Sequence, residues 1–166
     1  MVSYKHLIGV ITLYNGHIRR NREPYVLHCI RMAQMAKDYG SGNRVQLLCL
    51  LHDVLELNKD VRLEQLRQIF SLESVDLDVL RILTCATDET SEQHFHRILN
   101  GKSIYALLVK WFDCYDNSQF VQEDFNFYET HMSEPMLEAR LKYINRLRLI
   151  EQKLAEYGHP VPSKMG

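Results

Sequence analysis

Residues 43–56 read NRVQLLCLLHDVLE, and this stretch decides how the chain folds. Apolar side chains lie almost all round the helix that it predicts, as expected for a helix surrounded by other helices. Two polar residues, His52 and Asp53, interrupt the apolar run. Burial of an imidazole or an ionised carboxylate without partners costs several kcal/mol. Both side chains must therefore be paired, hydrogen-bonded or bound to a metal ion.

The rest of the chain also follows a helical pattern. Apolar periodicity, with Gly, Pro and capping residues as punctuation, predicts eight helices over about residues 2–14, 24–40, 43–56, 63–70, 73–83, 103–117, 121–130 and 134–157. Residues 84–91 are polar and predict a loop that ends in a helix cap. No run alternates apolar and polar residues convincingly enough for a strand. The predicted fold class is therefore all-α, a helical bundle with helices 43–56 and 103–117 at its centre.

Length and composition bound the function more loosely. At 166 residues the chain fits a single domain, since domains run to roughly 100–200 residues. With 46% hydrophobic and 25% charged residues the chain is typical of globular proteins, which excludes a disordered or coiled-coil protein. A net charge of −1 means that the chain lacks the overall positive charge typical of nucleic-acid-binding proteins. The apolar run over residues 7–14 is too short to span a membrane, so we expect a cytoplasmic protein, and a homo-oligomer remains open.

The sequence predicts no metal-binding or catalytic role for the cysteines or for a pair of histidines. The four cysteines lie in apolar stretches without a CxxC pair, which predicts small buried side chains in a reducing compartment, not a zinc or redox site; they are Cys29, Cys49, Cys85 and Cys114. His94 and His96 could suggest a second metal site. Two histidines at i and i+2 on a helix face different directions, however, and surface positions are the simpler prediction.

Four residues together predict a metal site. His52 and Asp53 point about 100° apart on a helix, so both reach one ion only if other helices supply further ligands. His28 and Asp113 are the natural suppliers. Taken singly, His28 could be a core or surface histidine and Asp113 a surface acid. Two imidazoles and two carboxylates favour Mn²⁺, Fe²⁺ or Co²⁺ over structural zinc and make Mg²⁺ less suitable.

The same residues carry a family resemblance. The order of His28, His52-Asp53 and Asp113 resembles the H…HD…D signature of HD-domain metal-dependent phosphohydrolases. The flanking blocks are GHIRRNREPYVLH at 16–28, similar to GQxRKxGxPYxxH; LLHDVLE at 50–56 with LEQLR at 63–67 and Phe70, similar to LLHDxxEDT…TLExLxxxFG; and ALLVKWFD at 106–113 with Asn117, similar to AxxVKLADxxxN. These are the blocks of the hydrolase domain of RelA/SpoT-type alarmone enzymes and of stand-alone small alarmone hydrolases. The resemblance covers about residues 4–120, and residues 121–158 fit the closing helices.

The resemblance implies an enzyme with a metal site between its central helices. It would be a Mn²⁺-dependent pyrophosphohydrolase, with Fe²⁺ or Co²⁺ possible, that removes the 3′-diphosphate from ppGpp-like nucleotides by attack of metal-activated water. The implied metal ligands are His28, His52, Asp53 and Asp113. Asp53 and Glu56 are the implied catalytic residues, Glu56 to orient or deprotonate the water. The implied substrate contacts are Arg19, Arg20, Lys110 and Asn117, although a snorkelling role at the helix rim suits Lys110 equally well.

Departures from the pattern keep two other functions open. Leu57 replaces the second acid of the family's Glu-Asp pair, Asn58 replaces the following Thr, and His17 replaces a Gln. One alternative is a nucleotide phosphatase of the HD superfamily, of the deoxynucleotide or NADPH type, which would release orthophosphate. The other is a non-catalytic nucleotide-binding module that has kept the metal and lost efficient hydrolysis, for which Leu57 is the motivation.

Overall fold

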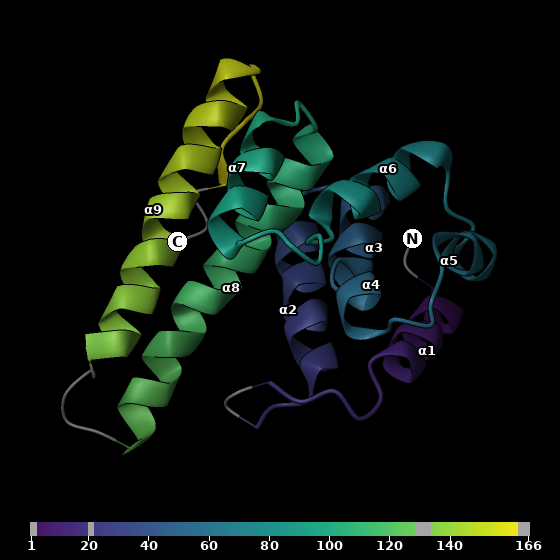
Figure 1. The fold of residues 1–166 in the computed structure, drawn as a ribbon, viewed down its shortest axis with the longest axis horizontal. Coiled ribbons are helices and arrows are strands. Elements are labelled where there is room, and N and C mark those ends of the chain that lie inside the picture. The colour runs from purple at the N-terminus through teal and green to yellow at the C-terminus, as the bar shows by residue number, and fades with distance from the viewer. Residues whose placement is uncertain (1–2, 20–21, 129–133, 163–166) are drawn as a thin grey trace.

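The computed structural model describes residues 3–19, 22–128 and 134–162, without the side chains of 120–128 and 136. Within these residues every regular element is an α-helix, as Figure 1 shows, which confirms the all-α prediction. The helices are α1 (Tyr4–Leu13), α2 (Tyr25–Asp38), α3 (Asn43–Leu51), α4 (Val54–Leu57), α5 (Leu63–Phe70), α6 (Ser74–Leu83), α7 (Ser91–Asn100), α8 (Ile104–Tyr128) and α9 (Glu134–Glu156). None of the helices described is long and apolar enough to cross a membrane.

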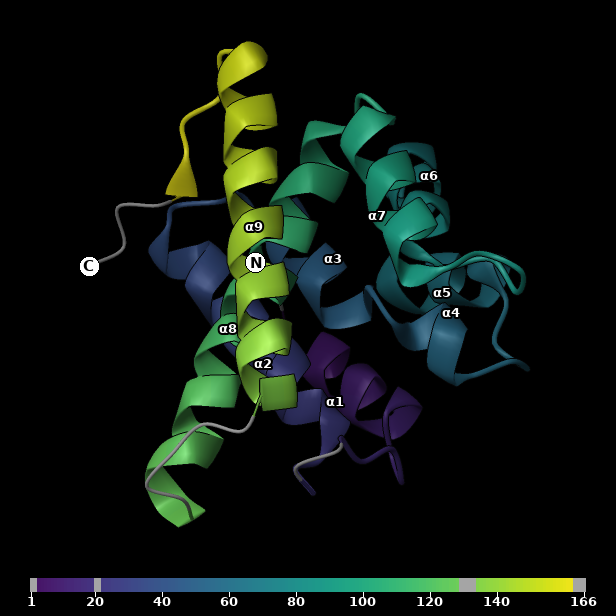
Figure 2. The ribbon, with the colours of Figure 1, turned by 60° about the vertical axis from the view of Figure 1, so that its left-hand side comes forward.

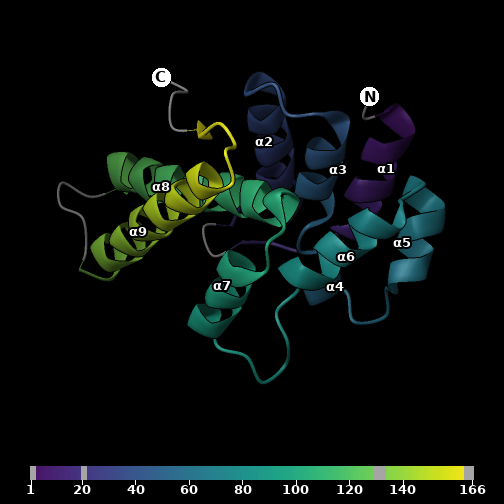
Figure 3. The ribbon, with the colours of Figure 1, turned by 90° about the horizontal axis from the view of Figure 1, so that it is seen from above.

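Helices α2, α3 and α8 form the middle of the bundle. The most extensive helix packing joins α8 to α9 and α2 to α3, and α8 also packs against both α2 and α3. The pair α8 and α9 lies on one side of the molecule and α1 with α5 on the other (Figures 2 and 3). Buried apolar side chains from α3 and α8 meet in the core, among them Leu48, Leu51, Val109 and Phe112. The predicted central position of these two sequence segments is therefore confirmed.

The predicted helix over residues 43–56 is interrupted at the two residues that matter most. Helix α3 ends at Leu51, and Asp53 has φ −104° and ψ 2°, outside the helical region, before α4 begins. His52 Nδ1 lies 3.0 Å from the carbonyl oxygen of Cys49, the group that an uninterrupted helix would offer to the Asp53 N–H. The side chain of His52 thus competes with the backbone, and the pair lies in a turn instead of on a helix.

Two other boundaries differ from the prediction. Helix α8 runs without a break through residues 117–121, because Ser118 donates its hydroxyl hydrogen to the carbonyl oxygen of Tyr115 at 2.8 Å and so caps no new helix. Helix α7 was not predicted as an element, since it offers few apolar positions. It begins after a capping box in which Thr90 Oγ1 accepts from the Gln93 N–H and Gln93 Oε1 accepts from the Thr90 N–H.

Candidate metal centre

Three separate elements bring the four predicted ligands together. Helix α2 carries His28, the turn after α3 carries His52 and Asp53, and α8 carries Asp113. His28 Nε2 lies 3.3 Å from Asp113 Oδ1, and the rings of His28 and His52 are 5.3 Å apart between centroids. One ligand atom from each of His28, His52 and Asp113 lies within 4.8 Å of the other two, and all three residues are buried. Asp53 joins this group through His52, with Oδ2 2.9 Å from His52 Nε2.

Hydrogen bonds on the far side of each ring turn both lone pairs toward the same space. His28 Nδ1 lies 2.7 Å from Asp116 Oδ2, and His52 Nδ1 lies 3.0 Å from the carbonyl oxygen of Cys49. Both partners are acceptors, so each Nδ1 carries a hydrogen, and each Nε2 is left to face a carboxylate with either a proton or a metal ion between them. This is the arrangement in which imidazoles bind metal ions, with the second ring nitrogen donating to a carboxylate or a carbonyl.

The buried Nε2 of His52 tests whether a metal ion fits. This atom makes no hydrogen bond to the described residues, although it lies 2.9 Å from Asp53 Oδ2. A lone pair that faces a carboxylate at this distance needs a positive charge nearby, either a proton or a cation. Two imidazole nitrogens and the Asp113 carboxylate lie together, and Asp53 lies against His52, so the donor set suits a divalent first-row ion. The residues present therefore fit a metal ion.

Electrostatics keep both carboxylates ionised. Burial by itself would raise the pKa of Asp53, but the neighbouring His52 lowers it to about 2. Burial would likewise raise the pKa of Asp113, yet Lys110, whose Nζ lies 2.8 Å from Oδ2, and His28 hold it well below its usual range. Burial by itself would lower the pKa of His52, but the neighbouring Asp53 raises it well above its usual value. A proton thus occupies His52 readily, and a metal ion must displace it.

A pocket of about 470 Å³ opens beside these ligands. Its lining includes six of the predicted site residues, namely Arg19, Asp53, Glu56, Lys110, Asp113 and Asn117. Glu56 Oε1 accepts a hydrogen bond of 2.6 Å from the backbone N–H of Cys85. Burial, together with the charge of Asp53, raises the pKa of Glu56, which makes it a stronger base than an exposed glutamate.

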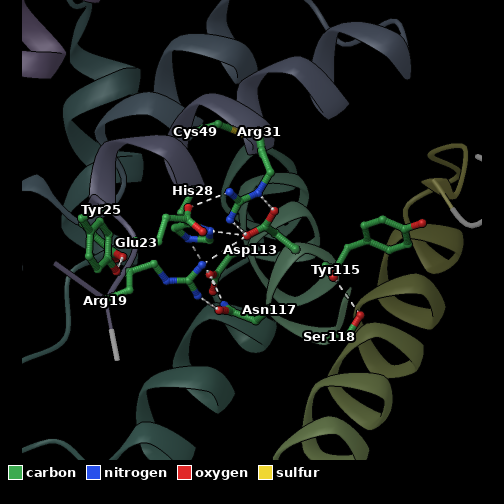
Figure 4. Close-up of polar contacts among 12 residues, drawn as sticks. Arg19, Glu23, Tyr25, His28, Arg31, Cys49, Asp113, Tyr115, Asn117 and Ser118 are labelled. Atoms are coloured by element: carbon green, nitrogen blue, oxygen red, sulfur yellow. Dashed lines mark hydrogen bonds and ion pairs between the residues drawn. The ribbon is translucent and has the colours of Figure 1, made fainter. Parts of the chain in front are cut away.

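The predicted substrate residues are tied to the ligands by hydrogen bonds. Asn117 Nδ2 donates to Asp113 Oδ1 at 2.6 Å, and Arg19 donates to Asn117 Oδ1 (Figure 4). Lys110 pairs with Asp113 at the pocket wall, where it can neutralise charge on the ligand as well as on a substrate. Arg20 lies outside the described residues.

Asp116 is a site residue that the sequence motif did not reveal. Its carboxylate accepts from His28 Nδ1 and also from Arg31, with Nε 2.6 Å from Oδ1 and Nη2 2.9 Å from Oδ2. Arg31 Nη1 in turn donates to Glu23 Oε1 at 2.6 Å. Burial would raise the pKa of Asp116, but His28 and Arg31 lower it to about 2. Its only signal in the sequence was its charge within the apolar run of residues 103–117. Tyr25, a matched position of the block at 16–28 for which the motif predicted no role, donates its hydroxyl hydrogen to Asp53 Oδ2.

Two structural interpretations of the sequence are wrong at this pocket. His94 is buried and lines the pocket, whereas only His96 is exposed as predicted. Cys85 is half-buried at the pocket wall, while the other three cysteines are buried as expected. Helix α7 turns His94 inward, and Cys85 lies in the loop that precedes this helix.

Comparisons with known proteins agree with this geometry. No protein-family model matches the chain. A probable guanosine-3′,5′-bis(diphosphate) 3′-pyrophosphohydrolase of Synechocystis is 28% identical over 102 residues, which cover 57% of this chain and 13% of that relative. A solved structure described as "A metazoan ortholog of SpoT hydrolyzes ppGpp and plays a role in starvation responses" matches with a TM-score of 0.68 and 21% identity, covering 92% of this chain and 86% of that one.

These two matches define the class of fold. The chain has the helical fold of the HD-domain proteins, with a His/Asp site between central helices that can hold a divalent ion. The cyanobacterial relative agrees with the resemblance to RelA/SpoT-type alarmone hydrolases that the sequence motifs carry, and the solved structure confirms the helical fold. The chain spans about one eighth of the length of the cyanobacterial relative.

Replacing Asp116 tests whether it positions His28. We expect Asp116→Asn to lower the affinity for Mn²⁺ by about 10–100-fold, the usual effect of removing a carboxylate that orients a metal-bound histidine. Isothermal titration of the purified variants with Mn²⁺ measures the change. The matched control is Asp78→Asn, which removes a carboxylate that pairs with Arg81 on the surface at 2.6 Å. Parental affinity in a folded Asp116→Asn protein would show that Asp116 has no role in positioning the ring.

Proposed function

We propose that the protein is a metal-dependent pyrophosphohydrolase that removes the 3′-diphosphate from a ppGpp-like nucleotide. The observation that carries the proposal is the buried cluster of His28, His52 and Asp113, whose ligand atoms lie within 4.8 Å of one another beside an open pocket, with the Asp53 carboxylate against His52. The printed names of the cyanobacterial relative and of the metazoan structure support the same substrate class. We infer Mn²⁺ as the ion, with Fe²⁺ or Co²⁺ as substitutes, and a cytoplasmic location, which suits the free cysteines among the described residues.

His28, His52, Asp53 and Asp113 would hold the ion in this proposal. When bound, such an ion polarises a phosphoryl oxygen and lowers the pKa of a water molecule. Lys110 neutralises part of the negative charge of Asp113 and presents its ammonium group to the pocket. Tyr25 donates to Asp53, and Asn117 donates to Asp113, so each carboxylate has a neutral neighbour that fixes its direction.

We infer that Glu56 receives the proton of the attacking water. It lines the pocket, its carboxylate is held by the Cys85 N–H, and its raised pKa favours proton acceptance near neutral pH. Arg19 also lines the pocket, beside Asn117, where a guanidinium can bind phosphate or stack on a base. We infer that Glu56 serves the attacking water and Arg19 serves the nucleotide.

The products distinguish this proposal from its alternatives. With Mn²⁺ present, we expect the protein to convert ppGpp, pppGpp or ppApp into pyrophosphate and a 5′-nucleotide, because the carboxylates and Glu56 are arranged for attack on a diphosphate ester. Chromatography with separate detection of phosphate and pyrophosphate measures both products. Orthophosphate from deoxynucleotides or NADPH, without pyrophosphate, would favour the phosphatase alternative.

The matched control for this assay is Asp53→Ala. It removes one proposed ligand, so we expect loss of both bound manganese, by elemental analysis, and turnover. Stoichiometric manganese in Asp53→Ala would refute the ligand set. A metal-loaded parent that leaves every nucleotide unchanged would refute the hydrolase and support the binding module.

Leu57, the most serious departure from the family pattern, is directed at the core. It is partly buried and packs against the apolar cluster, and it does not line the pocket, whereas its neighbour Glu56 does. His17 and Asn58, two further departures, contact each other, with Nε2 3.3 Å from Oδ1. The second acid of the family pair is therefore replaced by a packing residue.

Introducing the family acid tests this interpretation. We expect Leu57→Asp to give no increase in kcat and to lower Tm by at least about 2–4 °C, the shift that about 1 kcal/mol causes in a domain of this size. The loss arises because a carboxylate replaces an apolar contact. Steady-state kinetics and thermal unfolding measure the two effects, with the exposed substitution Lys59→Asp as control. A large gain in kcat would show that the pocket lacks this acid.

A further inference from the structure

Three potential metal ligands gather beside the pocket, and two of them line it. They are Cys85 in the loop of residues 84–90, Glu89 at the end of that loop, and His94 in the first turns of α7. One ligand atom from each lies within 4.8 Å of the other two. None of the three belongs to the ligand set of the proposed catalytic ion.

Each of these side chains is already held in place. His94 Nε2 lies 3.3 Å from the carbonyl oxygen of Ile82, an acceptor, so the other ring nitrogen keeps its lone pair. Arg97 donates to both carboxylate oxygens of Glu89, from Nε at 2.8 Å and from Nη2 at 2.8 Å. Metal-binding histidines and carboxylates carry such outer hydrogen bonds, which reduce the freedom lost when an ion binds.

Arg97 also fixes the loop on which the cluster is built. Its Nη1 donates to the carbonyl oxygen of Ile82 at 3.0 Å, and its Nη2 donates to that of Thr84 at 2.9 Å. These bonds tie the end of α6 and the start of the loop to α7, which carries His94, and the bonds to Glu89 tie the other end of the loop. Cys85 and His94 both line the pocket, so a site between them would have its open side toward the pocket.

We propose that Cys85, Glu89 and His94 form a second metal site, which takes a thiophilic divalent ion of the zinc class. Thiolate sulfur, imidazole nitrogen and carboxylate oxygen are the donors that Zn²⁺ uses in proteins, and three protein ligands with one open position are typical of accessible zinc sites. Cys85 releases its thiol proton to solvent when the ion binds. The thiolate and Glu89 then balance the two positive charges of the ion, and Arg97 leaves the cluster with one net positive charge.

The site would act directly on the pocket. The backbone N–H of Cys85 donates to Glu56 at 2.6 Å. An ion on the Cys85 thiolate would therefore be bound by the same residue that holds the proposed base. It would also bring a positive charge to a pocket whose lining carries the carboxylates of Glu56, Asp53 and Asp113. A ligand oxygen that entered the pocket would meet this charge.

Sulfur distinguishes the second site from the first. The ligands of the proposed catalytic ion contain only nitrogen and oxygen, whereas Cys85 would give Co²⁺ a thiolate-to-metal charge-transfer band in the near ultraviolet. We expect the full-length protein to develop this band when titrated with CoCl₂, and Zn²⁺ to bleach it by displacement. The band should also appear in Asp53→Ala, in which the first site is disabled.

Variants of the cluster decide the proposal. We expect Cys85→Ser to abolish the band, and His94→Gln, which keeps the thiol, to raise the Co²⁺ dissociation constant at least about 10-fold.

The control His96→Gln changes an exposed histidine two residues away on the same helix and should leave the band unchanged. Circular dichroism establishes that each variant is folded. Absence of the band at saturating Co²⁺, its persistence in Cys85→Ser, or parental affinity in His94→Gln would each overturn the proposal.

Discussion

The structure depends on one contact between an imidazole nitrogen and a carboxylate oxygen. His52 Nε2 lies 2.9 Å from Asp53 Oδ2, is buried, and makes no hydrogen bond within the described residues. Such a contact is stable only with a positive charge beside it, so the fold has to deliver a proton or a cation to this point. The break between α3 and α4 follows from the same residues, since His52 directs Nδ1 to the carbonyl of Cys49 and leaves Nε2 facing inward.

The surroundings of this contact are organised to keep the charge in place. On one side, Glu23, Arg31 and Asp116 form a chain of ion pairs that ends on His28. On the other, Lys110 and Asn117 hold Asp113, and Tyr25 holds Asp53. Each proposed ligand therefore has a second residue that sets its direction. The loop that carries Cys85 extends the arrangement to Glu56, so α7 influences the pocket although it supplies no proposed ligand of the first ion.

The sequence predicted the fold class and the residues that meet, because both depend on strong signals. Apolar periodicity identified α3 and α8 as central helices, and the polar interruptions within them identified His52, Asp53 and Asp113 as residues that need partners. The features that the sequence did not predict depend on competition between side-chain and backbone hydrogen bonds or on contacts between residues distant in sequence. The end of α3 at Leu51 is decided by one side-chain hydrogen bond, α7 has few apolar positions, and the bond between Asp116 and His28 joins residues 88 apart. Arg31 and Glu23, which extend that bond, offered no pattern at all.

Electron spin-echo spectroscopy of the Mn²⁺-loaded protein tests the central claim most directly, because the modulation of the echo reports nitrogen nuclei bound to the ion. If His28 and His52 hold the ion through Nε2, the spectrum will show coupling to two imidazole nitrogens. The His28→Ala variant should show coupling to one. A spectrum of the parent protein without imidazole coupling, at one bound Mn²⁺ per chain, would contradict the account.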